Sequence, residues 1–378
     1  MSNKKPVVAH YISSFLPLTE NWIYKLLINQ KDYKPIVITR SVKNQNLYPF
    51  DNIYSLATKR ICEKYLELIR FKFLGYIPFF KNVCKKESTS ILHVHFGYQG
   101  IKSIGLKKKL GIPMVCSFYG YDVFKLPKQE KYKKAYIKLF QNADKILALG
   151  PYMKNELISL GCPENKIEIH HLGIDTQKIK FKPRKLDPNS PIKILLASSF
   201  VEKKGIDVTI KALGILKNDF SFKVEIIGDG YLKENLIGLI KDNNLENDIV
   251  LHGYKPYDFF IDKTYECDIF VQASKTTTDN DKEGTPMSLV DAMASGMPVV
   301  STHHSDIPEI VIDGYNGYLA EENSVDDLVR CIKRIICTDN FEELSINARK
   351  HIEEQFDAST LAVKLENIYT NLINNCQR

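Results

Sequence analysis

Two carboxylates spaced eight residues apart are the most informative feature of this 378-residue chain. Glu283 opens the run Glu283-Gly-Thr-Pro-Met-Ser-Leu-Val-Asp291, and Asp291 lies inside a helix that we expect to begin near Pro286 and end at Ser295. The start of such a helix stabilises a diphosphate through free N–H groups and its dipole. Because carboxylates only accept hydrogen bonds, Glu283 and Asp291 suit sugar and ribose hydroxyls beside it. Taken alone, the two residues equally fit simple helix capping.

Two other loops carry groups that suit a phosphorylated ligand. Lys204 follows Lys203 at the end of a predicted strand and precedes Gly205, which permits a tight turn, so it suits a phosphate contact. Such turns are also common on protein surfaces. Gly228 and Gly230 follow the next strand and would let a ligand approach the backbone, but the third glycine of a dinucleotide fingerprint is missing.

Composition narrows the class of protein. The length fits two domains, 44% of the residues are hydrophobic, and no window is apolar enough for a membrane span. The N-terminus leads into a first strand at 7–12 and does not read as a signal peptide, which predicts a cytoplasmic protein. Eight scattered cysteines without a nearby histidine cluster predict neither a disulfide framework nor a metal site, and we expect no cofactor.

Charge divides the chain near its middle. Residues 1–185 hold 33 Lys and Arg against 13 Asp and Glu, whereas residues 186–378 hold 19 against 32. The basic half suits an anionic membrane surface, a lipid phosphate or an acidic glycan, although a solvated Lys-rich surface explains it as well. Nucleic-acid binding lacks a recognisable motif, so we expect none.

Short apolar runs alternate with helical patterns in both halves, which predicts parallel α/β sheets covered on both faces. We expect two doubly wound Rossmann-like domains, 1–185 and 186–357, joined by a linker near 180–190 and separated by a deep cleft. A last helix within 358–378 is expected to pack across both domains. The strands of the acidic half are expected at 192–198, 222–227, 249–252, 269–273, 298–301 and 317–320.

The order and spacing of these pieces resemble the retaining glycosyltransferases of family 4, which have the GT-B fold. The resemblance covers most of the chain and is densest over 197–320. It rests on the segments Val201-Glu-Lys-Lys-Gly-Ile-Asp207, Gly228-Asp-Gly230, Leu251-His-Gly-Tyr254, Glu283 through Pro298, Ile307 through Gly317, and His171-Leu-Gly-Ile-Asp175.

The resemblance implies transfer of a hexosyl-type sugar from a UDP- or GDP-sugar, without a metal, to a glycan or lipid-linked acceptor in surface polysaccharide biosynthesis. It implies that Glu283 holds the donor sugar and that Asp291 binds the ribose. The donor loop includes Gly284 and Thr285. The other implied donor contacts are the Lys204 side chain, the backbone of Met287, Ser288 and Leu289, Gly228, and Tyr254 near the base.

Three positions depart from the family pattern. Ser199 stands where an Arg is common, a loss that Lys203 would compensate, and Asp291 replaces a Glu. A signature that commonly reads His-Gly-x-Asp is here Tyr119-Gly-Tyr-Asp122, and a Tyr carries protons less readily than a His near neutral pH. Asp122 is our candidate for orienting the acceptor or supplementing the base, and capping of the turn that follows it is an equal alternative.

Two further regions concern the acceptor. His93 and His95 end a predicted strand and are candidate acceptor contacts, although histidines at such places are often structural. The stretch 58–86 interleaves eight Lys and Arg with aromatic and aliphatic residues, which predicts either peripheral membrane contact or two core-packing helices with a basic face. An alternative to the enzyme is a noncatalytic partner that binds a nucleotide-sugar in a glycan assembly complex, a reading motivated by Ser199 and Tyr119.

Overall fold

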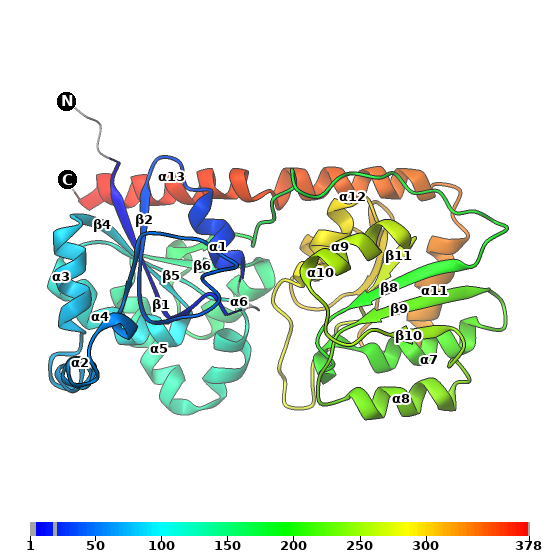
Figure 1. The fold of residues 1–378 in the computed structure, drawn as a ribbon, viewed down its shortest axis with the longest axis horizontal. Coiled ribbons are helices and arrows are strands. Elements are labelled where there is room, and N and C mark those ends of the chain that lie inside the picture. Colours follow the sequence, from blue (N-terminus) through cyan, green and yellow to red (C-terminus); the bar gives the residue numbers. More distant parts are fainter. Residues whose placement is uncertain (1–4, 18–20, 377–378) are drawn as a thin grey trace. The chain divides into compact units, whose positions relative to one another are not determined.

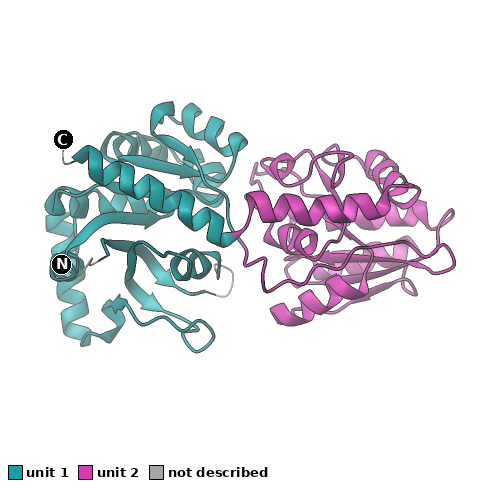
Figure 2. Cartoon of the chain, turned by 90° about the horizontal axis from the view of Figure 1, so that it is seen from above, with its two compact units in different colours: residues 1–173, 358–378 teal, residues 174–357 magenta. Residues whose placement is uncertain are grey.

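The computed structural model describes residues 5–17 and 21–376. The chain forms two compact units, one of residues 1–173 with 358–378 and one of residues 174–357 (Figure 2). The boundary therefore lies about twelve residues before the expected one at 185. Residues after Gly173 pack with the second unit because Ile174 forms a β-bridge to Asp357 and the Thr176 hydroxyl donates to the Asp357 carboxylate at 2.6 Å.

The first unit is built on a parallel seven-stranded sheet of order β3-β2-β1-β4-β5-β6-β7 (Figure 1). Its strands are nearly continuously apolar, as expected for a sheet covered on both faces. Alternate side chains of the strands face opposite layers, so Leu92 and Val94 pack with α3 to α6 while Val8 and Ile91 pack with α13. The strands are β1 Val7–Phe15, β2 Lys34–Val42, β3 Ile53–Ser55, β4 Thr89–His95, β5 Met114–Ser117, β6 Lys145–Ala148 and β7 Ile167–Ile169.

Seven helices surround this sheet within the described residues. The basic and aromatic stretch 58–86 contains α2 and α3. Gly75 lies between these helices in the left-handed conformation, at a φ of 73°. The helices are α1 Asn21–Ile28, α2 Ile61–Leu74, α3 Pro78–Lys86, α4 Gly97–Leu110, α5 Glu130–Asn142, α6 Pro151–Ser159 and α13 Ala358–Cys376. None of the described helices is both long and apolar enough to cross a membrane.

The last helix, α13, belongs to the first unit, whereas we expected it to pack across both domains. Its Glu366 carboxylate accepts hydrogen bonds from the backbone N–H groups of Asp32 and Tyr33, at 2.8 and 3.2 Å. Leu365 and Tyr369 of the same helix are fully buried against the sheet. These polar and apolar contacts complete the first unit with residues from the far end of the chain.

The second unit contains a parallel six-stranded sheet of order β10-β9-β8-β11-β12-β13. One face packs on α7, α8 and α11, and the other packs on α9, α10 and α12. The strands are β8 Ile192–Ala197, β9 Phe222–Ile227, β10 Ile249–Leu251, β11 Ile269–Val271, β12 Val299–Thr302 and β13 Gly317–Ala320. The helices are α7 Ile206–Leu216, α8 Lys233–Asp242, α9 Tyr257–Glu266, α10 Met287–Ala294, α11 Val325–Ile336 and α12 Phe341–Gln355.

Both units are doubly wound, which confirms the expected fold class. Strand order reverses between β1 and β4 in the first sheet and between β8 and β11 in the second. Ligands of open α/β sheets bind at such switch points, beyond the carboxyl ends of the strands. The loops that follow β8 and β11 carry Lys204 and Glu283.

Candidate functional site

The structure brings Lys204 and Glu283 together at the switch point of the second sheet. The Lys204 ammonium forms an ion pair with Glu283 Oε2, and both side chains are largely buried, with 14% and 11% of their surfaces exposed. Gly205 makes this approach possible, because it has a φ of 61° and a Cβ there would lie 1.7 Å from the Ala273 carbonyl oxygen. Seventy-nine residues of sequence separate two groups that form one site.

The surroundings keep Glu283 ionised. Burial alone would raise the pKa of its carboxyl, but the charges of Lys204 and Lys203 outweigh burial and leave that pKa below its usual range. Lys203 itself is paired with Asp281 at 3.3 Å. Ser199, where the expected second cation is missing, is exposed. Lys204 is therefore the cation placed directly against Glu283.

His304 fixes the backbone of Glu283, a role that the sequence did not reveal. Its Nε2 accepts a hydrogen bond from the Glu283 N–H at 2.9 Å, and its Nδ1 donates to the Glu322 carboxylate at 2.6 Å. Glu322 also accepts from the Thr276 N–H at 2.7 Å. Because burial lowers the pKa of His304, the ring is neutral with its proton on Nδ1. The only sequence signal was position: His304 follows β12 and Glu322 follows β13, at the same edge of the sheet.

Helix α10 begins beside the ion pair, as the sequence predicted. Pro286 is its N-cap, with Gly284 buried and Thr285 partly exposed before it. The Leu289 N–H donates to the Pro286 carbonyl at 3.0 Å, so this amide already has a partner. Within the described residues, the amides of Met287 and Ser288 are the first-turn donors left without an acceptor. Free amides at the start of a helix are groups that can bind an anion.

Asp291 is buried one turn into α10 and accepts a hydrogen bond from the Tyr257 hydroxyl at 3.0 Å. Burial, followed by the nearby Asp291 charge, raises the pKa of Tyr257, so this hydroxyl keeps its proton and donates. Tyr257 is a second site residue that sequence reasoning missed. Tyr254, the expected neighbour of the base, is 69% exposed on the loop after β10.

The packing of the loop after β8 explains why glycines follow β9. Gly228 has a φ of 150°, and a Cβ there would lie 1.9 Å from the Ser198 carbonyl oxygen. A Cβ on Gly230 would lie 2.5 Å from the Phe200 carbonyl oxygen. We expected these residues to admit a ligand, but the space next to them is filled by the loop that follows β8. Gly228 thus shapes the loop that presents Lys204.

In the first unit, Tyr119 ends a chain of buried polar groups. Its hydroxyl is 2.6 Å from His95 Nδ1, His95 Nε2 is 3.0 Å from His10 Nδ1, and the Gln30 amide nitrogen is 3.1 Å from His10 Nε2. Burial lowers the pKa of His10 to about 3 and that of His95 well below its usual range, so both rings are neutral. Since the Gln30 amide nitrogen can only donate, each ring donates onward and the Tyr119 oxygen accepts.

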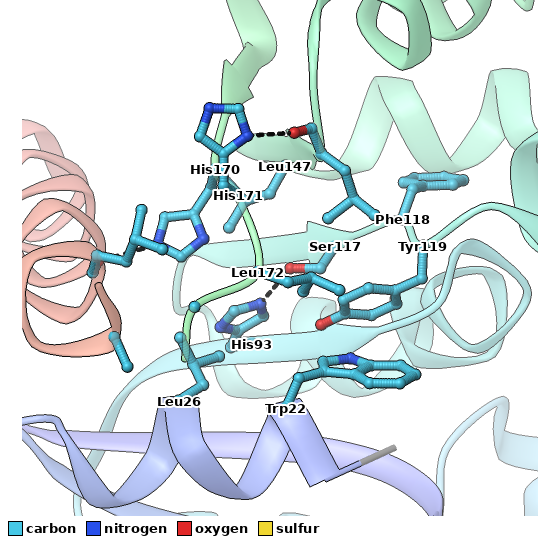
Figure 3. Close-up of a pocket in the computed structure, with 14 residues that line it drawn as sticks. Trp22, Leu26, His93, Ser117, Phe118, Tyr119, Leu147, His170, His171 and Leu172 are labelled. Carbon is cyan, nitrogen blue, oxygen red and sulfur yellow. Dashed lines mark hydrogen bonds between the residues drawn. The ribbon is translucent and has the colours of Figure 1, made fainter. Parts of the chain in front are cut away.

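His93 lines a pocket beside this chain (Figure 3). Its Nε2 is 2.7 Å from the Ser117 hydroxyl, and its Nδ1 is 2.5 Å from the Tyr369 hydroxyl. Tyr119 lies above the Trp22 ring in the same pocket, with the two ring centres 6.0 Å apart. His93 and His95, the two expected acceptor contacts, are fully buried, whereas Tyr119 is partly exposed.

Asp122 has a structural role, but its printed partners precede it in the sequence and do not belong to the following turn that we expected it to cap. It is fully buried, Oδ2 accepts from the Gly97 N–H at 2.7 Å, and Oδ1 accepts from the N–H groups of Tyr119 and Gly120 at 2.9 and 3.1 Å. Burial raises its pKa to about 6, although the backbone donors offset part of that rise. The carboxylate therefore holds the Tyr119 loop against the start of α4.

His10, His93 and His95 lie close enough together to raise the question of a metal site, which the sequence did not predict. Their rings stack: the planes of His93 and His95 differ by 21°, and those of His10 and His95 by 19°. Lone pairs of stacked rings lie in parallel planes and do not point toward a common ion. All three rings instead make the hydrogen bonds described above, which fits a structural cluster better than a metal centre.

The fold and the second-unit site define a glycosyltransferase with the GT-B architecture. The chain belongs to glycosyltransferase family 4. A family model described as "Glycosyltransferase Family 4" matches residues 28–178, and one described as "Glycosyl transferases group 1" matches residues 177–353.

Two curated relatives support this membership. The chain is 35% identical over 277 residues to the amylovoran biosynthesis glycosyltransferase AmsK of Erwinia amylovora, a match that covers 72% of this chain and 68% of AmsK. It is 31% identical over 296 residues to the putative colanic acid biosynthesis glycosyltransferase WcaL of Escherichia coli K12, with 76% and 72% covered.

Solved structures share the fold over nearly the whole chain. A glycosyltransferase from Rickettsia africae superposes with a TM-score of 0.77 at 18% identity, covering 98% of this chain and 99% of that one. Anabaena HepE in complex with UDP also gives a TM-score of 0.77, at 16% identity, with 97% and 100% covered.

Proposed function

We propose that this protein transfers a hexosyl-type sugar from a UDP- or GDP-sugar to a glycan or lipid-linked acceptor in surface polysaccharide biosynthesis, with retention of configuration. The observation that carries the proposal is the buried pair of Lys204 and Glu283 at the start of α10. One member of the pair suits a phosphate and the other suits sugar hydroxyls, so a nucleotide-sugar bound at this pair would meet both groups.

The names of similar proteins support the acceptor and donor classes. AmsK and WcaL are named for amylovoran and colanic acid biosynthesis, which are pathways of polysaccharide formation. HepE, which shares the fold, has been solved with UDP-glucose. We extend both features to this chain as part of the proposal, together with a location at the cytoplasmic surface of a membrane.

The proposed chemistry depends on charge that develops on the leaving group. As the glycosidic bond breaks, negative charge accumulates on the departing diphosphate, and the Lys204 ammonium with the amides of Met287 and Ser288 would stabilise it there. These groups supply positive charge without a metal, and we expect activity to persist in EDTA. Glu283 would hold the sugar hydroxyls, and the acceptor hydroxyl would lose its proton to the departing phosphate.

Replacement of Glu283 tests the proposal. We expect Glu283→Gln to reduce hydrolysis or transfer of the preferred nucleotide-sugar by about 100-fold or more, since a neutral amide cannot replace the charged acceptor beside Lys204. The variant should still be stabilised against heat by the matching nucleoside diphosphate, which would show that it folds. Glu234→Gln, an exposed change on α8, is the matched control and should keep full activity.

The outcomes separate the proposal from its alternatives. Full turnover by Glu283→Gln would refute the assigned site. A wild-type protein that binds a nucleotide-sugar but neither hydrolyses nor transfers it would favour the noncatalytic partner. Thermal shifts measured with a panel of UDP- and GDP-sugars would identify the base and the sugar in one experiment.

A further inference from the structure

Helix α2 presents its apolar side chains to solvent. Phe73 is 83% exposed and Ile61 is 72% exposed, whereas Glu67 on the same helix is only 8% exposed. A surface helix ordinarily turns its apolar stripe toward the core and its charges outward. Large exposed apolar patches on a folded protein mark interaction sites.

Specific contacts hold α2 in this orientation. Oε2 of Glu67 accepts a hydrogen bond from the Phe79 N–H at 2.8 Å, in the first turn of α3. Phe71 packs against the core and lies under the Arg40 guanidinium, 5.6 Å from it. A rotation of α2 that buried Phe73 would remove both contacts, so the outward apolar face belongs to the folded state.

The exposed residues form one continuous face. Ile61, Tyr65, Ile69 and Phe73 are spaced four residues apart and so lie along one side of the helix. Cys62 and Leu66 lie beside this row, and both are exposed as well. We call these six residues the α2 face. In Figure 1, α2 lies at the outer edge of the first unit.

Cations lie on the helix that carries the α2 face, directly before it, and on the helix that follows. Arg60, Lys64, Arg70 and Lys72 lie on α2 or directly before it, and Lys81, Lys85 and Lys86 follow on α3. The unit that carries them holds 30 Lys and Arg against 13 Asp and Glu, a formal charge of +17. An apolar stripe with cations on the same helix is the pattern of helices that lie in the surface of an anionic bilayer.

We propose that the α2 face inserts into the surface of a membrane containing anionic lipids. A second copy of this chain is the less suitable occupant, because pairing two such faces would bring the cations of both copies together. The proposal builds on the proposed function, since insertion of α2 would hold the first unit where a lipid-linked acceptor lies.

Flotation with lipid vesicles tests the inference. We expect the wild-type protein to float with vesicles of phosphatidylglycerol and phosphatidylcholine, and to bind much less to vesicles of phosphatidylcholine alone. The charge-neutral change Ile69→Ser with Phe73→Ser should weaken partitioning about 10-fold or more, because it removes two large groups from the interface. Ile346→Ser with Val363→Ser alters two exposed apolar residues outside the α2 face and should leave binding unchanged.

Cys62 provides a direct probe of insertion. With exposed Cys337 and Cys376 replaced by serine, an environment-sensitive fluorophore on Cys62 should shift to the blue when anionic vesicles are added. The same label on Cys337, with Cys62 and Cys376 replaced, should not shift. Vesicle binding without a shift at Cys62 would mean electrostatic adsorption and would overturn insertion.

Other results also overturn the proposal. Vesicle binding that is unaffected by Ile69→Ser with Phe73→Ser would overturn it. A wild-type protein that binds no vesicles but forms a dimer, which the same double change dissociates, would also overturn it. Hydrolysis of the nucleotide-sugar in solution is measured on the same samples. This measurement distinguishes a failure of the membrane proposal from a failure of the proposed enzymatic function. We expect the double variant to hydrolyse the nucleotide-sugar at the wild-type rate, because α2 lies outside the donor site.

Discussion

Tyr119 stands where the family resemblance led us to expect a His, and the structure shows how the Tyr side chain is held. The hydrogen-bond chain from Gln30 through His10 and His95 orients the Tyr119 oxygen as an acceptor. Both rings stay neutral because burial lowers their pKa. This row of hydrogen bonds therefore positions Tyr119 as a hydrogen-bonding group, and its neutral histidines do not carry an extra proton.

This reading predicts a difference between two substitutions of Tyr119. Tyr119→Phe should lower sugar transfer to the acceptor by about 10-fold or more, because it removes a hydrogen bond made by the hydroxyl. Hydrolysis of the donor in water should change little. Tyr119→His should retain transfer, since an imidazole N–H replaces the donor.

Steady-state kinetics with acceptor and with water alone would separate the two activities. Tyr136→Phe is a useful control, because its hydroxyl donates to the Asp122 carbonyl in the core and should affect stability more than transfer. Equal loss of transfer and hydrolysis in Tyr119→Phe would contradict the positioning role.

The residues of the donor site were predicted unevenly from the sequence. Glu283, Lys204 and the start of α10 follow from local patterns, and the structure places them together. His304, Glu322 and Tyr257 follow from no local pattern, because each acts through a residue distant in sequence. The order of the strands in the sheet decides which distant residues contact the site. The periodicity of a single sequence does not determine that order.

At the scale of elements, β1 and β4 combine sheet formation with a buried histidine cluster. His10 and His93 are register partners on these adjacent strands, and His95 follows two residues later on the same face. Short apolar runs predicted both strands, but they did not show that the histidines of these strands would be fully buried. We predicted His93 and His95 as acceptor contacts because they end a predicted strand. The end of a strand in the sequence need not be exposed in the fold, and both side chains are fully buried.

The buried histidines of the first unit, which are the three of the cluster and His170, predict acid sensitivity. Burial lowers the pKa of His10 to about 3 and of His170 to about 4, and holds those of His93 and His95 well below 6.5. Below about pH 6.5 the unfolded chain binds protons that the folded chain does not, so stability is lost as pH falls. Each such proton costs about 1.4 kcal/mol per pH unit. We expect the urea midpoint to fall clearly between pH 7 and pH 5.

Asp122 acts with the opposite sign over part of this range. Its folded pKa of about 6 lies above the usual 3.8, so it favours the folded state as pH falls from 6 to 4, but it is one group against four. His10→Gln should reduce the dependence of stability on pH, whatever its effect on stability at pH 7. A urea midpoint that stays level or rises on acidification would show that the histidines are accessible to protons in the folded state.

At the scale of the molecule, the two units carry opposite formal charges of +17 and −10. The acidic unit nevertheless contains the proposed phosphate site, because Lys204 and the start of α10 supply positive potential locally. The sequence predicted a basic first domain and an acidic second domain, with a boundary about twelve residues later than the one between the two units. It did not reveal that the first unit is completed by α13, since an amphipathic helix at the end of a chain carries no signal for the sheet that it covers.

The completion of the first unit by α13 leads to a prediction about unfolding. Trp22 is the single tryptophan and lies in the first unit, so its fluorescence reports on that unit, while stabilisation by a nucleoside diphosphate would report on the second. Leu365→Ala removes a fully buried side chain of α13 and should destabilise the first unit by about 3 kcal/mol. Val363→Ala, on the exposed face of the same helix, should change stability by less than about 0.5 kcal/mol.

Urea titrations followed by Trp22 fluorescence, with and without the nucleoside diphosphate, measure both effects. We expect Leu365→Ala to move the fluorescence transition to lower urea and to leave the affinity for the nucleoside diphosphate unchanged, because α13 contributes to the core of one unit and the ligand binds the other. A fluorescence transition equal to that of Val363→Ala would mean that α13 adds little to the first unit. A parallel loss of nucleotide affinity would instead mean that the two units fold as one, and the separate cores seen in the structure would not be separate in stability.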